Sequence, residues 1–224
     1  MNNIRKYIAL AAKILCIGLL FYVFTAGFYA QVPQLPILNE SIRLLYFHVP
    51  MWFGMIVLLG IASYRAICCL RNPSPRRDLE VLSFTQMGMF FGLMGLLTGM
   101  IWAQNTWGEA WSNDPKQNAS ALGLLLYLAY FTLRQTLSAD QEQRMRWSAA
   151  YNVFCFLSLI PLLFILPRLT DSLHPGSGGN PGFDTYDLDA SLRKVFYPAL
   201  VGWILLGVWI ANLLIRIGEI QKKS

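Results

Sequence analysis

Apolar residues fall into six long runs along this 224-residue chain, with polar segments between them. A helix of roughly 20 apolar residues crosses a hydrocarbon core about 30 Å thick, and its backbone groups are satisfied within the segment. None of the runs alternates like a membrane β-strand. The pattern predicts an all-α integral membrane protein with six transmembrane helices, at Ile8 to Ala30, Ile42 to Cys68, Leu79 to Trp102, Ala119 to Leu137, Trp147 to Pro167 and Val195 to Ile215.

The composition agrees with this pattern, because 55% of the residues are hydrophobic and only 13% are charged. Little sequence remains for a soluble domain, so we expect residues 1–224 to form a single six-helix transmembrane domain. No small-residue cleavage site follows the first run, which favours a retained helix over a removed signal peptide.

The positions of Lys and Arg predict the orientation, because loops rich in these residues stay on the cytoplasmic side. With the N-terminus inside, thirteen of the eighteen basic residues lie on that side; the other five are Arg43, Lys116, Arg168, Arg193 and Lys194. Lys13 lies within the first helix, and its long side chain can reach the inner interface. Six helices place both termini in the cytoplasm. This topology accounts for the net charge of +6, and we expect no nucleic-acid partner.

The four cysteines lie in the apolar runs or at their inner ends, and none forms a CxxC or CxxCH motif. A thiol redox motif and a covalent haem attachment site are therefore absent from the sequence. We expect these residues to pack as small hydrophobic side chains: Cys16, Cys68, Cys69 and Cys155.

Both histidines of the chain, His48 and His174, fall on the predicted outer side. A lone histidine at a membrane interface is often a polar residue at a convenient depth, and this is the alternative for each of them. For His48 the alternative is weaker, because a polar ring among Tyr46, Phe47 and Val49 is costly without a partner.

Pro50 makes the backbone near His48 irregular. It cannot donate a hydrogen bond to the carbonyl of Tyr46, so the second helix must begin near His48 or kink there. Two histidines from distant elements could ligate one metal from opposite sides, as two axial ligands do in a haem. Zinc fits less well, because it needs four ligands and this side offers no cysteine and no third histidine.

A tryptophan-rich segment, IWAQNTWGEAWSNDPKQN, lies on the same side. Trp107 and Trp111 are four residues apart, so their indoles share a face if the segment is helical. Indole offers a flat apolar surface on which a macrocycle can stack. The alternative is an aromatic belt at the interface, which accounts better for Trp102 and Trp147 at the ends of helices.

Haem propionates need cationic partners, and two basic residues are placed for this role by sequence. Arg43 lies five residues before His48, and Lys116 lies two residues after Asp114. The alternative is that both are ordinary charges at the membrane interface.

The segment WAQNTWGEAWSNDPK resembles the tryptophan-rich "WWD" signature of haem-handling proteins of cytochrome c biogenesis. That family includes haem exporter protein C (CcmC) and the CcsA/ResC synthase component. The stretch RLLYFHVPMW resembles the family's RxxYxHVPxxW sequence, and His174 falls where the second external histidine is found. Six helices and this length are most similar to CcmC. Ala110 and Asn113 stand where aromatics are usual, and the signature is matched by Trp107, Gly108, Trp111, Asp114, Pro115 and Lys116.

The resemblance implies a protein of the bacterial inner membrane that holds haem b at its periplasmic face, non-covalently and transiently. It implies that His48 and His174 are axial ligands and that Arg43 and Lys116 contact the propionates. Asp114 would orient the loop or a neighbouring basic group. The haem-binding segment would further include Trp107, Gly108 and Trp111.

The partners that the resemblance implies are a periplasmic haem chaperone of the CcmE type and subunits of an ABC transporter. This chain has no Walker motif of its own.

Three other functions are alternatives to haem delivery. The residues Asp114 to Lys116 favour a CcsA/ResC-like component of a haem-attachment synthase, and only then would the chain be an enzyme. A b-type electron-transfer subunit would need histidine pairs within the bilayer, which are missing. A small-molecule transporter is disfavoured by the scarcity of ionisable residues within the runs.

Overall fold

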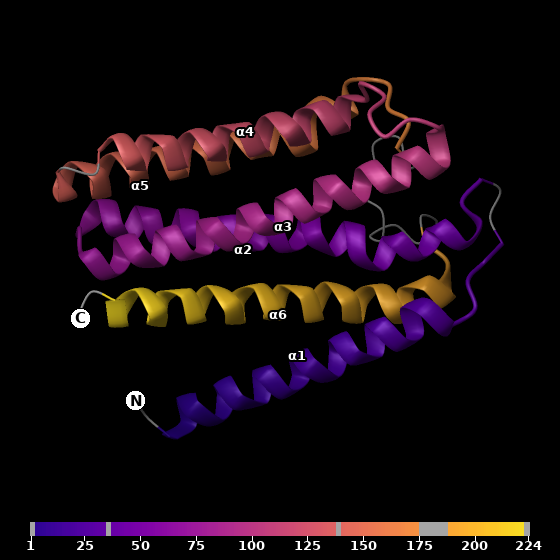
Figure 1. The fold of residues 1–224 in the computed structure, drawn as a ribbon, viewed down its shortest axis with the longest axis horizontal. Helices are drawn as coiled ribbons and strands as arrows, with labels where there is room; N and C mark the ends of the chain where they lie inside the picture. The colour runs from indigo at the N-terminus through magenta and orange to yellow at the C-terminus, as the bar shows by residue number, and fades with distance from the viewer. Residues whose placement is uncertain (1–2, 35–36, 138–139, 175–187, 222–224) are drawn as a thin grey trace.

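The computed structural model describes residues 3–34, 37–137, 140–174 and 188–221, and these contain helices, turns and loops but no strand. Six long helices lie side by side in an elongated bundle (Figure 1). A short helix η1 (Asn39–Leu44) leads into the second of them, and η2 (Pro161–Ile165) and η3 (Leu166–Arg168) continue the fifth. The long helices are α1 (Asn3–Tyr29), α2 (Leu45–Arg71), α3 (Pro75–Trp107), α4 (Pro115–Thr136), α5 (Gln141–Ile160) and α6 (Ala190–Gln221).

Five of the long helices begin several residues before the apolar run that predicted them, and at three of these a polar side chain caps the start. The caps are Ser74 for α3, Asp114 for α4 and Asp140 for α5, and each accepts a hydrogen bond from a backbone N–H of the first turn. Pro75 and Pro115 follow two of these caps, where their missing N–H is not needed. The helices therefore extend beyond their apolar parts.

Five of the six predicted membrane helices are long and apolar enough to cross a bilayer: α1, η1 with α2, α3, α5 with its short extensions, and α6. The remaining helix, α4, has polar residues near both ends, including Gln117 and Arg134, which leave a shorter apolar stretch. The chain is thus a multi-pass membrane protein, and α4 lies along α5 on one side of the bundle (Figure 1).

Successive helices run in opposite directions, so the connections gather at the two ends of the bundle. Both described chain ends lie at one end, together with the α2–α3 and α4–α5 connections (Figure 1). The α1–α2 connection, the α3–α4 loop and the end of η3 lie at the other, which we call the loop end. The three segments that sequence assigned to one side thus share one end of the molecule, although residues 175–187 of the third lie outside the described residues.

Glycines on one face of α3 let α2 approach it closely. Gly88, Gly92, Gly95 and Gly99 are spaced by four, three and four residues, which places them on one face of a helix. A Cβ atom on Gly88 would lie 2.5 Å from a Leu59 methyl carbon, so a side chain there would require Leu59 to shift. Such small residues are the usual means by which membrane helices pack closely. About 56% of the apolar part of α3 is buried, compared with 11% of α1, so α3 belongs to the interior and α1 to the periphery.

The end opposite to the loop end contains a buried ion pair that joins α3 to α4. Arg134 donates to both carboxylate oxygens of Asp78, at 2.6 and 2.9 Å, and both side chains are buried. Some of the charge near this end of the bundle is therefore part of the helix packing.

Candidate functional site

His48 lies in the first turn of α2, which begins at Leu45. Of the two alternatives for the backbone at Pro50, the structure therefore has the helix beginning near His48. The ring is buried, and its Nδ1 lies 3.0 Å from the Gly95 carbonyl oxygen and 3.2 Å from Thr98 Oγ1. A carbonyl only accepts, so Nδ1 carries the proton and Nε2 is left as a lone-pair donor.

Two tryptophans and a glycine form the walls around the His48 ring. Trp52 and Trp102 meet it edge-on, with centroids 6.3 and 5.7 Å away. A Cβ atom on Gly99 would lie 2.7 Å from His48 Cε1. Gly99, the last of the glycines on this face of α3, therefore leaves space for the His48 ring. Trp102 was predicted to mark the membrane edge. Its contact with His48 adds a second role that its position in the sequence did not indicate.

The tryptophan-rich segment is not a continuous helix, so the condition under which Trp107 and Trp111 would share a helical face is not met. The helix α3 ends at Trp107, because Gly108 adopts a left-handed conformation with φ of 83°. The loop from Gly108 to Asn113 follows, and Asn113 is also left-handed, with φ of 56°. Asn tolerates that conformation better than bulky aromatics do.

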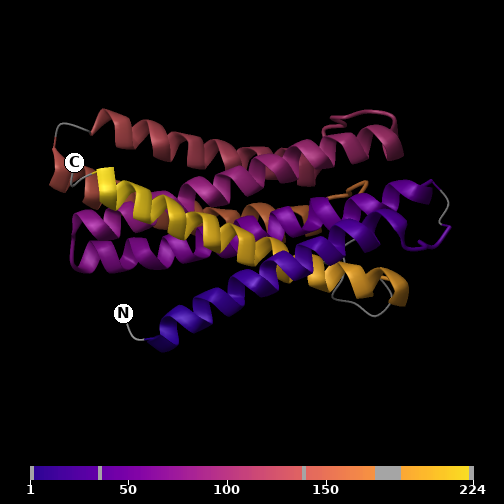
Figure 2. The same ribbon diagram turned by 60° about the horizontal axis from the view of Figure 1, so that its bottom comes forward.

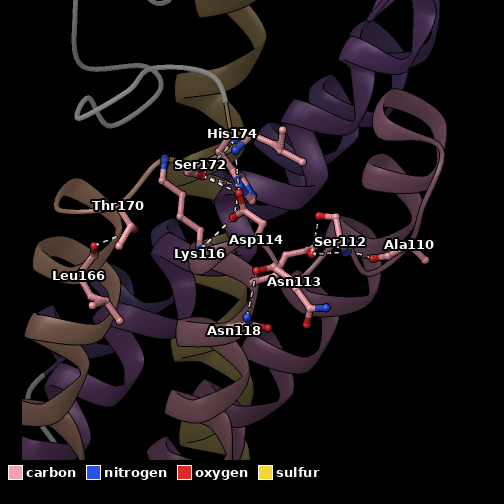
Figure 3. Close-up of polar contacts among 12 residues, drawn as sticks. Ala110, Ser112, Asn113, Asp114, Lys116, Asn118, Leu166, Thr170, Ser172 and His174 are labelled. Carbon is pink, nitrogen blue, oxygen red and sulfur yellow. Dashed lines mark hydrogen bonds and ion pairs between the residues drawn. The ribbon is translucent and has the colours of Figure 1, made fainter.

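Asp114 and His174 form the centre of the loop end (Figure 3). The carboxylate of Asp114 is fully buried, and its Oδ1 lies 2.9 Å from His174 Nδ1. Its Oδ2 accepts hydrogen bonds from Ser172 Oγ at 2.8 Å and from the Leu173 backbone N–H at 2.7 Å. Because a carboxylate accepts, His174 Nδ1 carries the proton and Nε2 again remains available. Trp107 packs edge-on against His174 with a centroid distance of 4.9 Å.

The charge states of this pair follow from its surroundings. Burial alone would raise the pKa of Asp114, but hydrogen bonds from Ser172 and Leu173, and the neighbouring His174, hold it below its usual value. Burial lowers the pKa of His174 and Lys116 adds to this effect, while Asp114 opposes it without reversing the shift. Asp114 is therefore ionised at neutral pH, and His174 is neutral with a free lone pair.

The structure places the two predicted propionate partners differently. Lys116 lies in the first turn of α4, and its side chain runs beside the segment that carries Thr170 and Ser172 (Figure 3). Arg43 instead donates to the carbonyls of Gly27 and Ala30 at the end of α1, and pairs with Glu40 at 2.8 Å. It stabilises the C-terminus of α1, and a contact of Arg43 with a propionate stays a prediction.

Sequence reasoning missed residues that hold this site in place. Gln117 is buried and fixes the loop, accepting from Ser112 N–H at 3.1 Å and donating to the Ala110 carbonyl at 3.2 Å. Ser172 was not singled out, although it connects Asp114 to the segment of His174. The regular glycine spacing on α3 was a readable signal, whereas nothing in the sequence distinguished Gln117 or Ser172.

Comparison with known proteins identifies a family that matches the part of the chain containing both histidines. Residues 2–174 match the family described as "Cytochrome C assembly protein", a stretch that contains His48, the tryptophan-rich loop and His174. The chain belongs to the cytochrome c assembly protein family. The resemblance to CcmC and CcsA that the sequence suggested is thereby confirmed.

Three relatives illustrate the range of this cytochrome c assembly family. "Heme exporter protein C" of Haemophilus influenzae is 24% identical over 62% of this chain and 56% of its own length. The protein of the same name from Bradyrhizobium diazoefficiens is 26% identical over 78% of this chain and 67% of its own length. "Cytochrome c biogenesis protein CcsA" of Gloeobacter violaceus is 34% identical over 50% of this chain and 34% of its own length. The chain thus spans just over half of the Haemophilus protein.

Proposed function

We propose that this chain binds haem at the loop end of the bundle, with His48 and His174 as axial ligands, and delivers it to a periplasmic haem chaperone of the CcmE type. The loop end would face the periplasm and both termini the cytoplasm, with all six helices crossing the bacterial inner membrane. Haem b is then a transient, non-covalently held cargo, and subunits of an ABC transporter would act beside the chain.

One observation carries this proposal: each histidine is held through Nδ1 and leaves Nε2 free. His48 donates to a backbone carbonyl, and His174 donates to a carboxylate. Metal-binding histidines usually donate their second ring nitrogen to such an acceptor, which fixes the ring and makes the ligating nitrogen more basic.

Other residues at the loop end fit a flat, dicarboxylate cargo. Trp102 presents an indole N–H that is buried and has no hydrogen-bond partner among the described residues. Trp107 adds apolar ring surface against His174, and Lys116 provides a positive charge two residues from Asp114. These residues would bind and orient haem, whose iron would supply the two axial positions.

Hand-over requires that one of the two ligands can be withdrawn. His48 is seated between two packed helices, whereas His174 lies on a loop segment and its side chain is 28% exposed. A chaperone would therefore reach the His174 side first. Because the Asp114 carboxylate holds this segment, it would set how readily His174 releases.

The second candidate is a component of a haem-attachment synthase. The higher local identity to the CcsA protein, 34% over 115 residues, favours it, as does the sequence Asp114 to Lys116. The chain would then act on an apocytochrome rather than on a chaperone.

A transfer assay distinguishes the two. The purified, haem-loaded chain is mixed in detergent either with a soluble haem chaperone of the CcmE type or with a reduced apocytochrome c. Delivery predicts that haem absorbance moves to the chaperone fraction, and that the apocytochrome stays without covalent haem. Covalent haem on the apocytochrome with this chain alone would contradict delivery and support the synthase.

A further inference from the structure

A cavity of about 280 Å³ lies between α1 and α6, away from the loop end. The two helices pack closely near Gly202, where an added Cβ atom would lie 3.1 Å from a Leu20 methyl carbon. They diverge toward the end that carries the chain ends, as both views of the ribbon show (Figures 1 and 2). The cavity lies on the diverging part and is open toward the surroundings of the bundle.

The charge of this cavity is entirely positive. Its walls include Lys13 from α1 and Arg216 from α6, and no acidic residue lines it. Neither cation has an ion-pair partner in the part of the chain that the structure describes, and Lys13 instead lies 5.2 Å from the centre of the Trp209 ring. Lys13 is ten residues into α1, about 15 Å from its start. A charge at such depth is costly unless it finds a partner.

A residue that lines this cavity also carries a hydrogen-bond donor without a partner. The indole N–H of Trp209 is buried and makes no hydrogen bond within the described residues. One other polar residue lines the cavity, Asn212, whose side chain donates to the Val208 carbonyl at 2.7 Å. The remaining walls are apolar and are formed by Ala9, Ala12, Leu205, Val208 and Leu213. Two cations and a donor above an apolar wall match a phosphate group that is attached to an acyl chain.

We infer that this cavity, which we call the α1–α6 cavity, binds one acidic phospholipid. Lys13, Arg216 and the Trp209 N–H would hold its phosphate, and an acyl chain would lie along the apolar wall. Basic pockets between membrane helices bind acidic headgroups in this way. The inference is independent of the haem site, because it concerns the opposite part of the bundle.

Native mass spectrometry of the purified protein tests this inference. The protein is delipidated in detergent and titrated with dioleoylphosphatidylglycerol or with dioleoylphosphatidylcholine. We expect retained adducts of the first lipid and markedly weaker ones of the second. Lys13→Gln and Arg216→Gln should each weaken the acidic adduct by roughly fivefold, the usual contribution of one cation.

Two further variants complete the design. Trp209→Phe keeps the ring and removes only the N–H, and should weaken the adduct roughly tenfold. Arg71→Gln removes a charge at the same end of the bundle but outside the cavity, and should leave binding unchanged.

Three results would overturn the inference. One is equal binding of both lipids. Another is an adduct with the mass of haem at the same three residues. The third is that the protein retains no lipid, while the variant Leu213→Cys forms a cross-link to a transmembrane helix of another protein. That result would show that a protein helix, and not a lipid, occupies the cavity.

Discussion

At the scale of single residues, Asp114 links the parts of the loop end. It caps α4 and binds the consecutive residues Ser172, Leu173 and His174, so one carboxylate joins the start of α4 to the segment 172–174. Replacing it by Asn puts an amide NH₂ next to donors, and we expect haem affinity to fall by about 10- to 100-fold. Titration followed by haem absorbance measures this. Asp171→Asn removes the same charge from an exposed position nearby and should change little; similar losses in both variants would contradict the role of Asp114.

The pH dependence of haem binding is also decided by these two residues. The pKa of His174 lies below its ordinary value of about 6.5, so Nε2 is unprotonated at pH 7. Haem affinity should be constant from about pH 7 to 8 and fall at lower pH, as protons compete with iron for Nε2. Asp114, whose pKa is also lowered, stays ionised across this range.

The same lowered pKa of His174 affects folding stability with the same sign. At pH values between the lowered pKa of folded His174 and its ordinary pKa of about 6.5, the unfolded chain binds more protons than the folded chain. The folded state therefore loses stability as the pH falls through this interval. Titrations from pH 5 to 8, with His174→Ala as the control that should lose the dependence, measure the binding effect. Affinity that rises on acidification would contradict it.

Sequence identified both histidines but not what holds them. His48 is anchored by Gly95, 47 positions away, and His174 by Asp114, 60 positions away. Such pairings depend on how the helices pack, which local patterns do not encode. The matched signature did include Asp114, but only the fold shows that the basic group it orients is His174.

At the scale of elements, the end of α3 decides where the tryptophans point. Gly108 is left-handed, and an added Cβ would meet nothing within 4 Å, so any cost of substitution comes from the backbone alone. Gly108→Ala should lower the free energy of unfolding by about 1 kcal/mol, whereas Gly108→Asn should cost less. Thermal unfolding of the two variants measures the difference. Equal free energies of unfolding for Gly108→Ala and Gly108→Asn would show that the left-handed backbone at this position does not determine the cost of substitution.

The buried pair between α3 and α4 makes a second prediction at this scale. Asp78→Ala would leave Arg134 as an unpaired buried cation and should cost about 3–5 kcal/mol of stability. The double variant Asp78→Leu with Arg134→Met should recover most of this loss. Glu142→Ala breaks an exposed pair with Arg146 and should cost less than about 1 kcal/mol. Equal costs for Asp78→Ala and Glu142→Ala, measured by denaturant unfolding, would contradict this account.

At the scale of the whole molecule, hydrophobic periodicity predicted most of the architecture. It located all six long helices and, through their alternation, the gathering of three segments at one end (Figure 1). It did not predict the helix ends, which depend on caps such as Ser74 and Asp140 outside the apolar runs. For α4 the apolar stretch is short, because Arg134 belongs to a buried pair and Gln117 holds the loop.

The bundle keeps its two halves chemically distinct. The buried Asp78–Arg134 pair and the α1–α6 cavity lie toward the chain ends, and the two histidines and the buried Asp114 lie at the loop end. Haem bound between His48 and His174 would join α2 to the segment after η3, two parts of the chain that the loop end brings together.

The absorption spectrum of purified protein loaded with haem tests this central claim most directly. Two imidazole ligands predict a six-coordinate low-spin haem in the wild-type protein. Replacement of either His48 or His174 by Ala should lower haem content and change the spectrum, and added imidazole should restore the parental form. Parental haem content and spectrum in both variants would contradict the account.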